Sequence, residues 1–213
     1  MTLEAARVLL DPSRPLPGEA ARLAMMPEYR RGPRPEDEAG PWREASVLIL
    51  LYPSDGRAVF PLIQRTSGTG VHAGQISLPG GSREPGESAE GCALRETSEE
   101  LGFDVSGVRI LRELTTLRVP PSRFRVRPFA GTLDARPVFR PSPAEVEECF
   151  ETDLEELLSP GSRQEDLVER EGRLWRVPFY RLAGRRVWGA TAMILAELAA
   201  VVGGPWTVDG ERE

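Results

Sequence analysis

Residues 81–103 of this 213-residue chain read GSREPGESAEGCALRETSEELGF, and their spacing decides what can be expected of the rest. Three glutamates in this stretch, Glu96, Glu99 and Glu100, fall at positions i, i+3 and i+4. On a helix these positions share one face, because successive residues are turned by about 100°. Three carboxylates on one face form a patch of oxygen ligands that suits a hard divalent cation such as magnesium.

The ends of this expected helix are marked as well. Ser88 is a favourable N-cap, and Gly102 stands where a left-handed C-terminal cap would end the helix. Without a cation, carboxylates at this spacing weaken a helix by about 0.2–0.5 kcal/mol per pair. Arg95 lies four residues before Glu99 and can hold that carboxylate in a ligating orientation. If the three glutamates stood alone, a solvated acidic helix face would be the preferred interpretation.

The glutamates belong, however, to a longer pattern of fixed residues. In order along the chain it consists of Gly81, Glu87, Arg95, Glu96, Glu99, Glu100 and Gly102, followed by the apolar Phe103. This pattern resembles the signature box of the Nudix hydrolases. The one departure is Thr97, where that family usually has an aliphatic residue. A threonine keeps a methyl group for packing and can return its hydroxyl to the carbonyl of Ala93.

The resemblance implies a fold and a reaction. The fold would be α/β, a Nudix-type α/β/α sandwich with a mixed β-sheet and a loop-helix-loop metal-binding box. The activity would be metal-dependent hydrolysis of a diphosphate linkage in a nucleoside diphosphate derivative, with Mg²⁺ or Mn²⁺ as cofactor. The implied metal ligands are Glu96, Glu99, Glu100 and the carbonyl of Gly80. Arg95 and Glu87 would not bind the metal themselves. Arg95 would hold the ligands in orientation, and Glu87 would be a structural or peripheral residue.

Composition excludes several other functions. All 27 basic residues are arginine, so a phosphate loop or Schiff base built on lysine is ruled out. A net charge of −6 argues against a general nucleic-acid binder. No run of about 18 apolar residues suggests a membrane span, and the N-terminus has no export signal. Two cysteines, Cys92 and Cys149, are too few for a disulfide framework, so a cytoplasmic location is expected.

The rest of the chain predicts an N-terminal extension over residues 1–44, a Nudix domain over 45–203 and a tail over 204–213. Within 1–44, short helical patterns stand at each end of the proline-rich stretch 12–17. The predicted strands are 45–53, 57–65, 108–119, 124–133, the stretch around 147–150 and a pair within 167–182 that turns at Glu171 and Gly172. Predicted helices follow at 153–158 and 189–202. A homodimer is left open.

A second motif concerns the substrate. Residues 62–81, LIQRTSGTGVHAGQISLPGG, resemble in spacing the extra motif of the coenzyme A pyrophosphatases within the Nudix family. Arg65, Gly74 and the run 79–81 fit that motif, whereas Gly70 and Leu78 replace its usual second arginine and phenylalanine. The stretches 143–158 and 187–198 resemble later parts of the same enzymes. The resemblance favours coenzyme A or its thioesters as substrate, cleaved to 3′,5′-ADP and 4′-phosphopantetheine or its acyl form.

Further roles remain open at this point. The general base could be Glu145, Glu99 or Glu100, with Glu148 as an alternative if the register differs by one turn. Arg65 is a candidate phosphate contact because a guanidinium binds phosphate in a bidentate fork. His72, the only histidine, is a candidate substrate contact and not the base. Competing functions are a Nudix pyrophosphatase for ADP-ribose, NADH or nucleoside triphosphates, and a non-catalytic nucleotide-binding regulator of the same fold.

Overall fold

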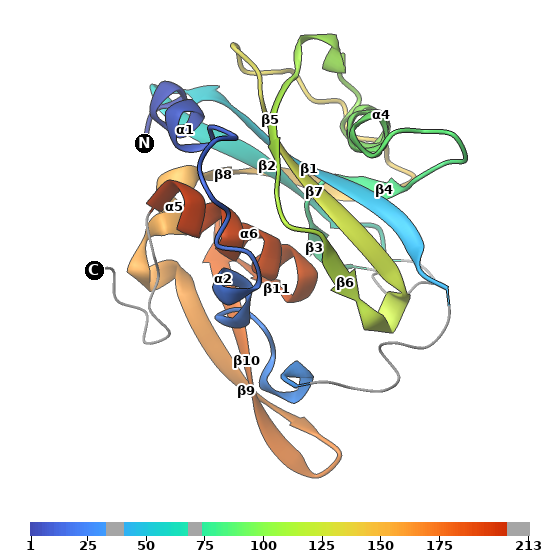
Figure 1. Cartoon of the computed structure of the whole chain (residues 1–213), viewed down its shortest axis with the longest axis vertical. Coiled ribbons are helices and arrows are strands. Elements are labelled where there is room, and N and C mark those ends of the chain that lie inside the picture. Colours follow the sequence, from blue (N-terminus) through green and yellow to red (C-terminus); the bar gives the residue numbers. More distant parts are fainter. Residues whose placement is uncertain (33–40, 68–73, 204–213) are drawn as a thin grey trace.

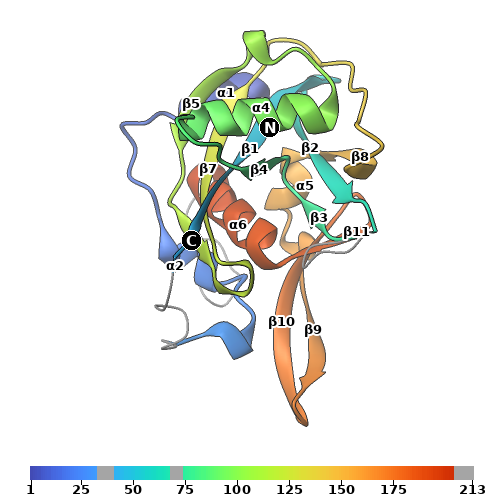
Figure 2. The ribbon, with the colours of Figure 1, turned by 90° about the vertical axis from the view of Figure 1, so that its right-hand side faces the viewer.

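The computed structural model describes residues 1–32, 41–67 and 74–203. A central mixed sheet lies between a single helix on one face and a group of helices on the other (Figures 1 and 2). The single helix is α4, Ala89–Leu101, which contains the three glutamates. The helices on the opposite face are α1 (Leu3–Leu9), α2 (Glu19–Leu23), α5 (Leu154–Leu158) and α6 (Gly189–Gly203). The predicted α/β/α sandwich with a mixed sheet is therefore confirmed.

The central sheet has eight strands. Five follow the order β3-β2-β1-β7-β5, while β4 pairs with β1, β6 with β7 and β8 with β2. Their bounds are β1 Arg43–Ser54, β2 Arg57–Arg65, β3 Ile76–Ser77, β4 Gly80–Ser82, β5 Arg109–Glu113, β6 Leu117–Val119, β7 Phe124–Thr132 and β8 Val146–Asp153. Only the pair β1 and β7 is parallel among these ladders. Residues 48–51 are all fully buried, as a central strand covered on both faces requires.

One predicted strand is divided. The stretch 108–119 was expected to be continuous, but it forms β5 and β6 with a break at residues 114–116. At this break, Arg22 donates to the carbonyl oxygens of Thr115 and Thr116, and the backbone N–H of Thr115 donates to Glu197. These backbone groups are satisfied by side chains and so are not paired with a neighbouring strand.

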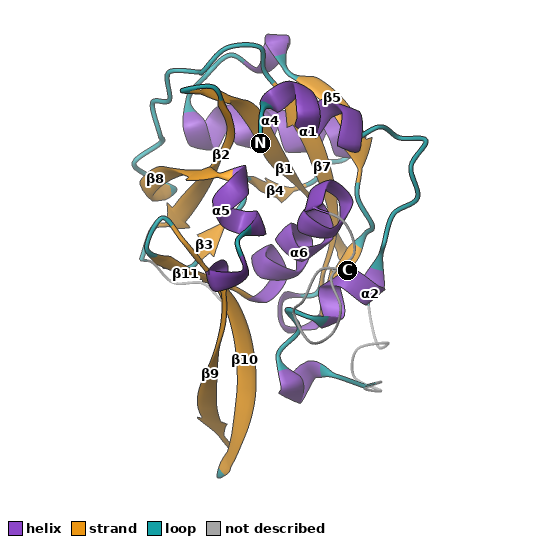
Figure 3. Ribbon diagram, turned by 90° about the vertical axis from the view of Figure 1, so that its left-hand side faces the viewer, coloured by secondary structure: helices purple, strands orange, loops and turns teal. Residues whose placement is uncertain are grey.

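A second sheet carries the remaining strands in the order β11-β10-β9. Its members are β9 (Arg163–Arg170), β10 (Arg173–Leu182) and β11 (Arg185–Trp188). Glu171 and Gly172 form the predicted turn, with φ of 56° and 73°. The tip of the β9–β10 hairpin extends well away from the body of the protein (Figures 1 and 3).

The core lies mainly between the sheet and α6. Ten residues of α6 are buried, including the charged Glu197, and eight of them share one hydrophobic cluster with residues of β1 and β2. Leu3, Leu10 and Met25 belong to the same cluster. The N-terminal segment thus contributes to the common core, and its separation as an extension over 1–44 stays a prediction. No helix within the described ranges is long and apolar enough to cross a membrane.

Candidate active site

The helix α4 has the predicted ends. The side chain of Ser88 accepts a hydrogen bond from the backbone N–H of Gly91 at 2.9 Å, and Gly102 is left-handed with φ of 62°. The hydroxyl of Thr97 donates to the carbonyl of Ala93 at 2.6 Å, as expected. Glu96, Glu99 and Glu100 therefore lie near the C-terminal end of a helix that is capped at both ends.

Arg95 contacts the carboxylates of Glu87 and of the acidic turn, the name used here for residues 96–100 of α4. Its guanidinium lies 2.8 Å from one oxygen of Glu87 and 3.1 Å from the other. Its Nη1 lies 2.9 Å from a carboxylate oxygen of Glu96 and, equally, from one of Glu99. The hydrogen bonds from Arg95 lower the pKa of Glu87 and raise the pKa of Arg95 itself. One arginine thus fixes the orientation of three carboxylates.

Glu100 is buried and joins the helix to the sheet. Its carboxylate accepts from the backbone N–H of Gly80 at 2.8 Å and pairs with Nη1 of Arg65, also at 2.8 Å. Burial raises the pKa of Glu100 to about 7, against the lowering effects of Gly80 and Arg65, and nearby Glu96 and Glu145 raise it further. The exposed fraction of the side chain is 1% for Glu100, 15% for Glu96 and 55% for Glu99.

Two glycines of β4 allow the close approach of strand and helix. A Cβ at Gly81 would lie 2.3 Å from a carboxylate oxygen of Glu96. A Cβ at Gly80 would lie 2.3 Å from the carbonyl oxygen of Ser46, and Gly80 has φ of 145°. Only glycine fits at either place without displacing a neighbour.

Glu145 reaches the same site through a loop that is tied to the end of α4. The backbone N–H groups of Arg140 and Ser142 donate to the carbonyls of Leu101 and Glu100, at 2.8 and 3.0 Å. The carbonyl of Glu145 accepts from the N–H of Thr66 at 3.0 Å, next to Arg65. Burial raises the pKa of Glu96, and the charges of Glu99 and Glu145 add to this. The loop thus brings Glu145 next to the end of β2, and its charge contributes to the raised pKa of both Glu96 and Glu100.

The donor set fits a divalent cation. Across the ranges 1–32, 41–67 and 74–203, no three acidic, histidine or cysteine side chains already stand in the arrangement of metal ligands. The arginines hold the carboxylates instead. Five carboxylates lie around two guanidinium groups, leaving three more negative than positive charges when all are ionised, at Glu87, Glu96, Glu99, Glu100, Glu145, Arg65 and Arg95. A surplus of negatively charged oxygen ligands is what magnesium or manganese requires.

Gly102 is needed for this arrangement, and its replacement by alanine is expected to destabilise the fold by about 1–3 kcal/mol. A Cβ there would lie 2.0 Å from the carbonyl oxygen of Arg140, in addition to the cost of the positive φ. Urea unfolding of Gly102→Ala should show the loss. Gly161→Ala is the control, because a Cβ at Gly161 meets nothing closer than 4.0 Å and its φ is not positive. Equal stability of the two variants would contradict the assignment.

Two further candidates lie elsewhere or outside the described residues. His72 falls in the range 68–73, which is not described, so its predicted role as a substrate contact stays a prediction. Glu148, the alternative base, is held in an ion pair by Arg185 of β11, whose guanidinium also lies 4.3 Å from the ring centre of Phe150. Among the described residues, the hydrogen-bond partner of Glu148 is thus Arg185 and not a residue of the acidic turn.

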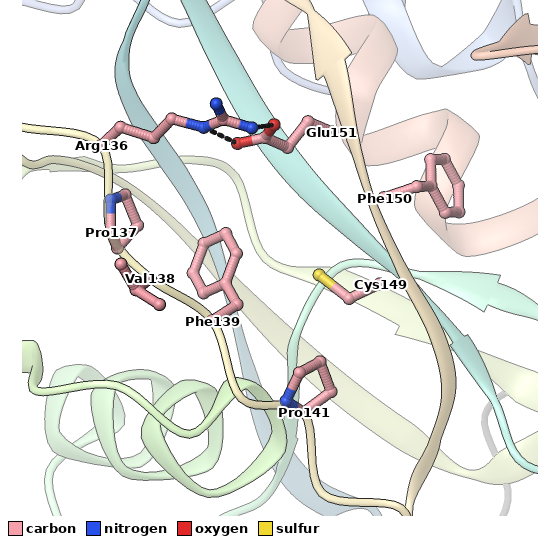
Figure 4. A pocket seen from close by; sticks show the side chains of 8 residues that line it. All are labelled: Arg136, Pro137, Val138, Phe139, Pro141, Cys149, Phe150 and Glu151. Carbon is pink, nitrogen blue, oxygen red and sulfur yellow. Dashed lines mark hydrogen bonds and ion pairs between the residues drawn. The ribbon is translucent and has the colours of Figure 1, made fainter.

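A pocket of about 480 Å³ opens beside β8, and Figure 4 shows its lining. At one end Arg136 forms an ion pair with Glu151, which also accepts from the hydroxyl of Tyr52 at 2.7 Å. The remaining lining is mainly apolar and consists of Pro137, Val138, Phe139, Pro141, Cys149 and Phe150. Phe139 packs edge-on against Phe103 and Tyr52. The pocket therefore adjoins the hydrophobic cluster behind α4.

The thiol of Cys149 in this pocket is expected to react slowly. Burial raises its pKa to about 11, and Glu151 and Glu148 add to the effect. At pH 8 the folded protein should therefore carry far less Cys149 thiolate than the unfolded chain, because the unfolded pKa is about 8.5. Alkylation with iodoacetamide at pH 8, followed by peptide mass spectrometry, should be slower in buffer than in urea. Equal rates at Cys149 would contradict this.

Some elements of the site had no clear signal in the sequence. The spacing of residues 81–103 identifies the glutamates and Arg95. The attachment of Arg140 and Ser142 to the end of α4 depends on backbone groups that no side-chain pattern announces. The prolines at 141 and 143 are the one hint, since proline favours an extended backbone over a helix. The expected contact of Arg65 with phosphate stays a prediction, and the structure shows this arginine paired with Glu100.

The sequence of this chain is similar to those of known proteins. The family described as NUDIX domain matches residues 42–173. A bacterial Nudix hydrolase called NudL and described as uncharacterised, from Photorhabdus laumondii, is 34% identical over 161 residues, which are 75% of this chain and 85% of that protein. The mitochondrial Nudix hydrolase 15 of Arabidopsis thaliana is 33% identical over 172 residues, 78% of this chain. The aligned region spans only 60% of the plant protein.

A solved structure supports the fold alone. A MutT/nudix family protein from Enterococcus faecalis superimposes with a TM-score of 0.51 and 17% sequence identity. The match covers 93% of this chain and 73% of that one. At this level of identity the likeness concerns the arrangement of strands and helices, and activity has to be argued from side chains.

Proposed function

Because this chain belongs to the NUDIX domain family, and so to a family of hydrolases, we propose that it cleaves the diphosphate linkage of a nucleoside diphosphate derivative. One observation carries the proposal. The three box glutamates, of which Glu100 is buried, and Glu145 together carry more negative charge than the two arginines balance. Such a site favours a divalent cation, and a cation of this kind is what brings a polyanionic diphosphate to an acidic surface.

In this proposal Glu96, Glu99, Glu100 and the carbonyl of Gly80 would hold Mg²⁺ or Mn²⁺. The bound ion supplies charge neutralisation for the phosphoryl oxygens and acidifies a water molecule. Arg95 keeps Glu96 and Glu99 turned towards the ion, since both carboxylates lie 2.9 Å from its Nη1. The N–H of Gly80 and Arg65 do the same for Glu100.

The chain's own groups would then handle the substrate and the proton. Water attacks one phosphorus, the bridging P–O bond breaks, and the second phosphate leaves with the bridging oxygen and its electron pair. Glu145 would accept the proton of the attacking water; Glu99 and Glu100 are the other candidates from the sequence. Arg65, whose side chain is 34% exposed, has N–H groups left over from its contact with Glu100 and would bind a phosphate oxygen.

The finer proposal is that the substrate is coenzyme A or one of its thioesters. Support comes from the motif over residues 62–81 and from its position in the fold. Thr191, at the start of α6, donates to the carbonyl of Ile76 at 3.3 Å. Two stretches that separately resemble the coenzyme A pyrophosphatases, 62–81 and 187–198, are therefore in contact and can shape one pocket wall.

A panel of substrates tests both levels of the proposal. Coenzyme A, acetyl-coenzyme A, ADP-ribose, NADH and nucleoside triphosphates would each be incubated with the protein and Mg²⁺, and the products identified by mass spectrometry. We expect 3′,5′-ADP and 4′-phosphopantetheine from coenzyme A, and no turnover after chelation with EDTA. Hydrolysis of another substrate in preference would keep the reaction and replace the substrate. Lack of hydrolysis across the panel with either ion would favour the nucleotide-binding regulator and refute the enzymatic proposal.

A further inference from the structure

The projecting part of the β9–β10 hairpin, residues 164–176, is here called the arm. It stands clear of the body in three views, and the segment nearest to it is the short helix at Glu28–Arg30 (Figures 1, 2 and 3). Among the described residues, six large hydrophobic side chains are exposed, and half of them lie on the arm. They are Leu167 at 65%, Leu174 at 59% and Val168 at 38%. Apolar side chains gathered on a projecting hairpin indicate an interaction surface.

The two faces of the arm differ. Val168 lies opposite Trp175, and the ring of Trp175 packs edge-on against Tyr29 with centroids 6.4 Å apart. That face is therefore partly covered by the protein itself. Leu167 and Leu174 lie on the other face, because side chains alternate along a strand and directly opposed residues share a face. Since Leu167 and Leu174 are both more than half exposed, this second face is largely open.

The outer edge of the arm is also free to pair. In the sheet order β11-β10-β9, strand β9 is the last, and its one described ladder is with β10. An edge strand presents unpaired N–H and C=O groups to any strand of suitable sequence. Edge strands usually avoid such pairing by carrying charges, and β9, with the sequence RQEDLVER, carries several. Whether those charges block pairing depends on the register in which two strands meet.

We propose that a second copy of this chain pairs with the outer edge of β9, antiparallel, with Val168 of both copies on the two-fold axis. In this register Asp166 of each copy faces Arg170 of the other, so opposite charges meet twice. Moving the axis to Leu167 would set Glu165 opposite Glu169 twice. An axis at Asp166 or at Glu169 would set two like charges against each other on the axis itself. The charges of β9 therefore select the register centred on Val168.

The exposed leucines fit the same arrangement. Leu167 opposes Glu169 of the second copy, and the two copies of Leu167 become diagonal neighbours, within reach of each other's side chains. Leu174 pairs with Glu169 within its own hairpin, which places it diagonal to Leu167. The four leucines of the two copies would then form one apolar band across four strands. Only about five residues of each β9 strand would form pairs with the other copy. The dimer should therefore be weak, with a Kd in the micromolar to millimolar range.

Sedimentation velocity of the full chain over a concentration series tests the proposal. The wild type should shift from monomer to dimer with rising concentration. Asp166→Arg and Arg170→Asp should each raise the Kd at least about tenfold, because like charges then face each other across the axis. The double variant with both substitutions should restore dimerisation. The double variant cannot restore the contact of Asp166 with Arg186, 2.9 Å away in the same chain, so rescue distinguishes pairing from a folding effect.

A second pair of variants examines the axis. Val168→Lys should give a monomer, since two lysines would meet at the centre. Val138→Lys is its control, because Val138 is 77% exposed and lies beside the β8 pocket, away from the arm. A wild type that stays monomeric throughout the series would overturn the proposal. So would a dimer that survives Val168→Lys, or a failure of the double charge variant to recover.

Discussion

Glu99→Gln is expected to lower metal-dependent turnover by roughly 10²–10⁴-fold, the range seen when a carboxylate that acts directly in catalysis is removed. The amide keeps the size of the side chain but loses the negative charge that a divalent cation requires. Glu99 is 55% exposed and its recorded partner is Arg95, so the fold should be unaffected. The measurement is kcat at saturating Mg²⁺ with whichever substrate the panel identifies, alongside urea unfolding.

The matched control is Glu90→Gln in the same helix. Glu90 lies in the first turn of α4, on the side opposite Glu99 at about 100° per residue, and it is exposed. Its substitution removes the same charge from the same helix without touching the acidic turn. We expect wild-type turnover from it. If Glu99→Gln and Glu90→Gln both keep near-wild-type activity, the proposed ligand set is wrong.

The second large effect is expected for stability. Glu197→Ala should lower the free energy of unfolding by about 3–5 kcal/mol, the usual cost of removing one partner of a buried ion pair. Glu197 is fully buried and accepts from Nε of Arg22 at 3.0 Å, and from the N–H and hydroxyl of Thr115 at 3.1 and 2.5 Å. The alanine would leave Arg22, itself 2% exposed, charged and without its carboxylate.

Urea unfolding of three variants separates the contributions. Glu197→Gln should lose less than Glu197→Ala, because the amide oxygen still accepts hydrogen bonds. Replacing both partners, as Arg22→Met with Glu197→Leu, should recover part of the loss, since no buried charge is then left unpaired. A change below about 1 kcal/mol for Glu197→Ala would mean that water reaches Arg22 and that the pair is not a buried one.

The sequence was most informative where structure is local. The helix from Ser88 to Gly102, the hydroxyl of Thr97 on the carbonyl of Ala93, and the contact of Arg95 with Glu99 all depend on residues within one or two turns of each other. Periodicity and capping rules act over that range. The Glu171-Gly172 turn was predictable for the same reason.

What could not be predicted depends on residues far apart in the chain. The break between β5 and β6 is made by Arg22 and Glu197, which lie 93 and 82 residues from Thr115 in sequence. The position of Glu145 rests on amides of residues 140 and 142 meeting the end of α4. Both are cases of tertiary hydrogen bonding overriding a local pattern, and neither leaves a periodic mark in the sequence. The projection of the arm could not be predicted either, because it depends on which distant segments of the chain pack against the hairpin.

The placement of α6 limits how this protein can be divided. The segment that matches the family, residues 42–173, contains the acidic turn but neither α6 nor the helices α1 and α2 that pack on it. Excising that segment would remove α1, α2 and α6 from one face of the sheet, where α5 alone of these four helices would remain, and would take away many apolar residues of the cluster that contains Phe60 and Leu62. We therefore expect that residues 42–173 would not fold stably on their own, and that a chimera containing the acidic turn would also need the helices on the opposite face of the sheet.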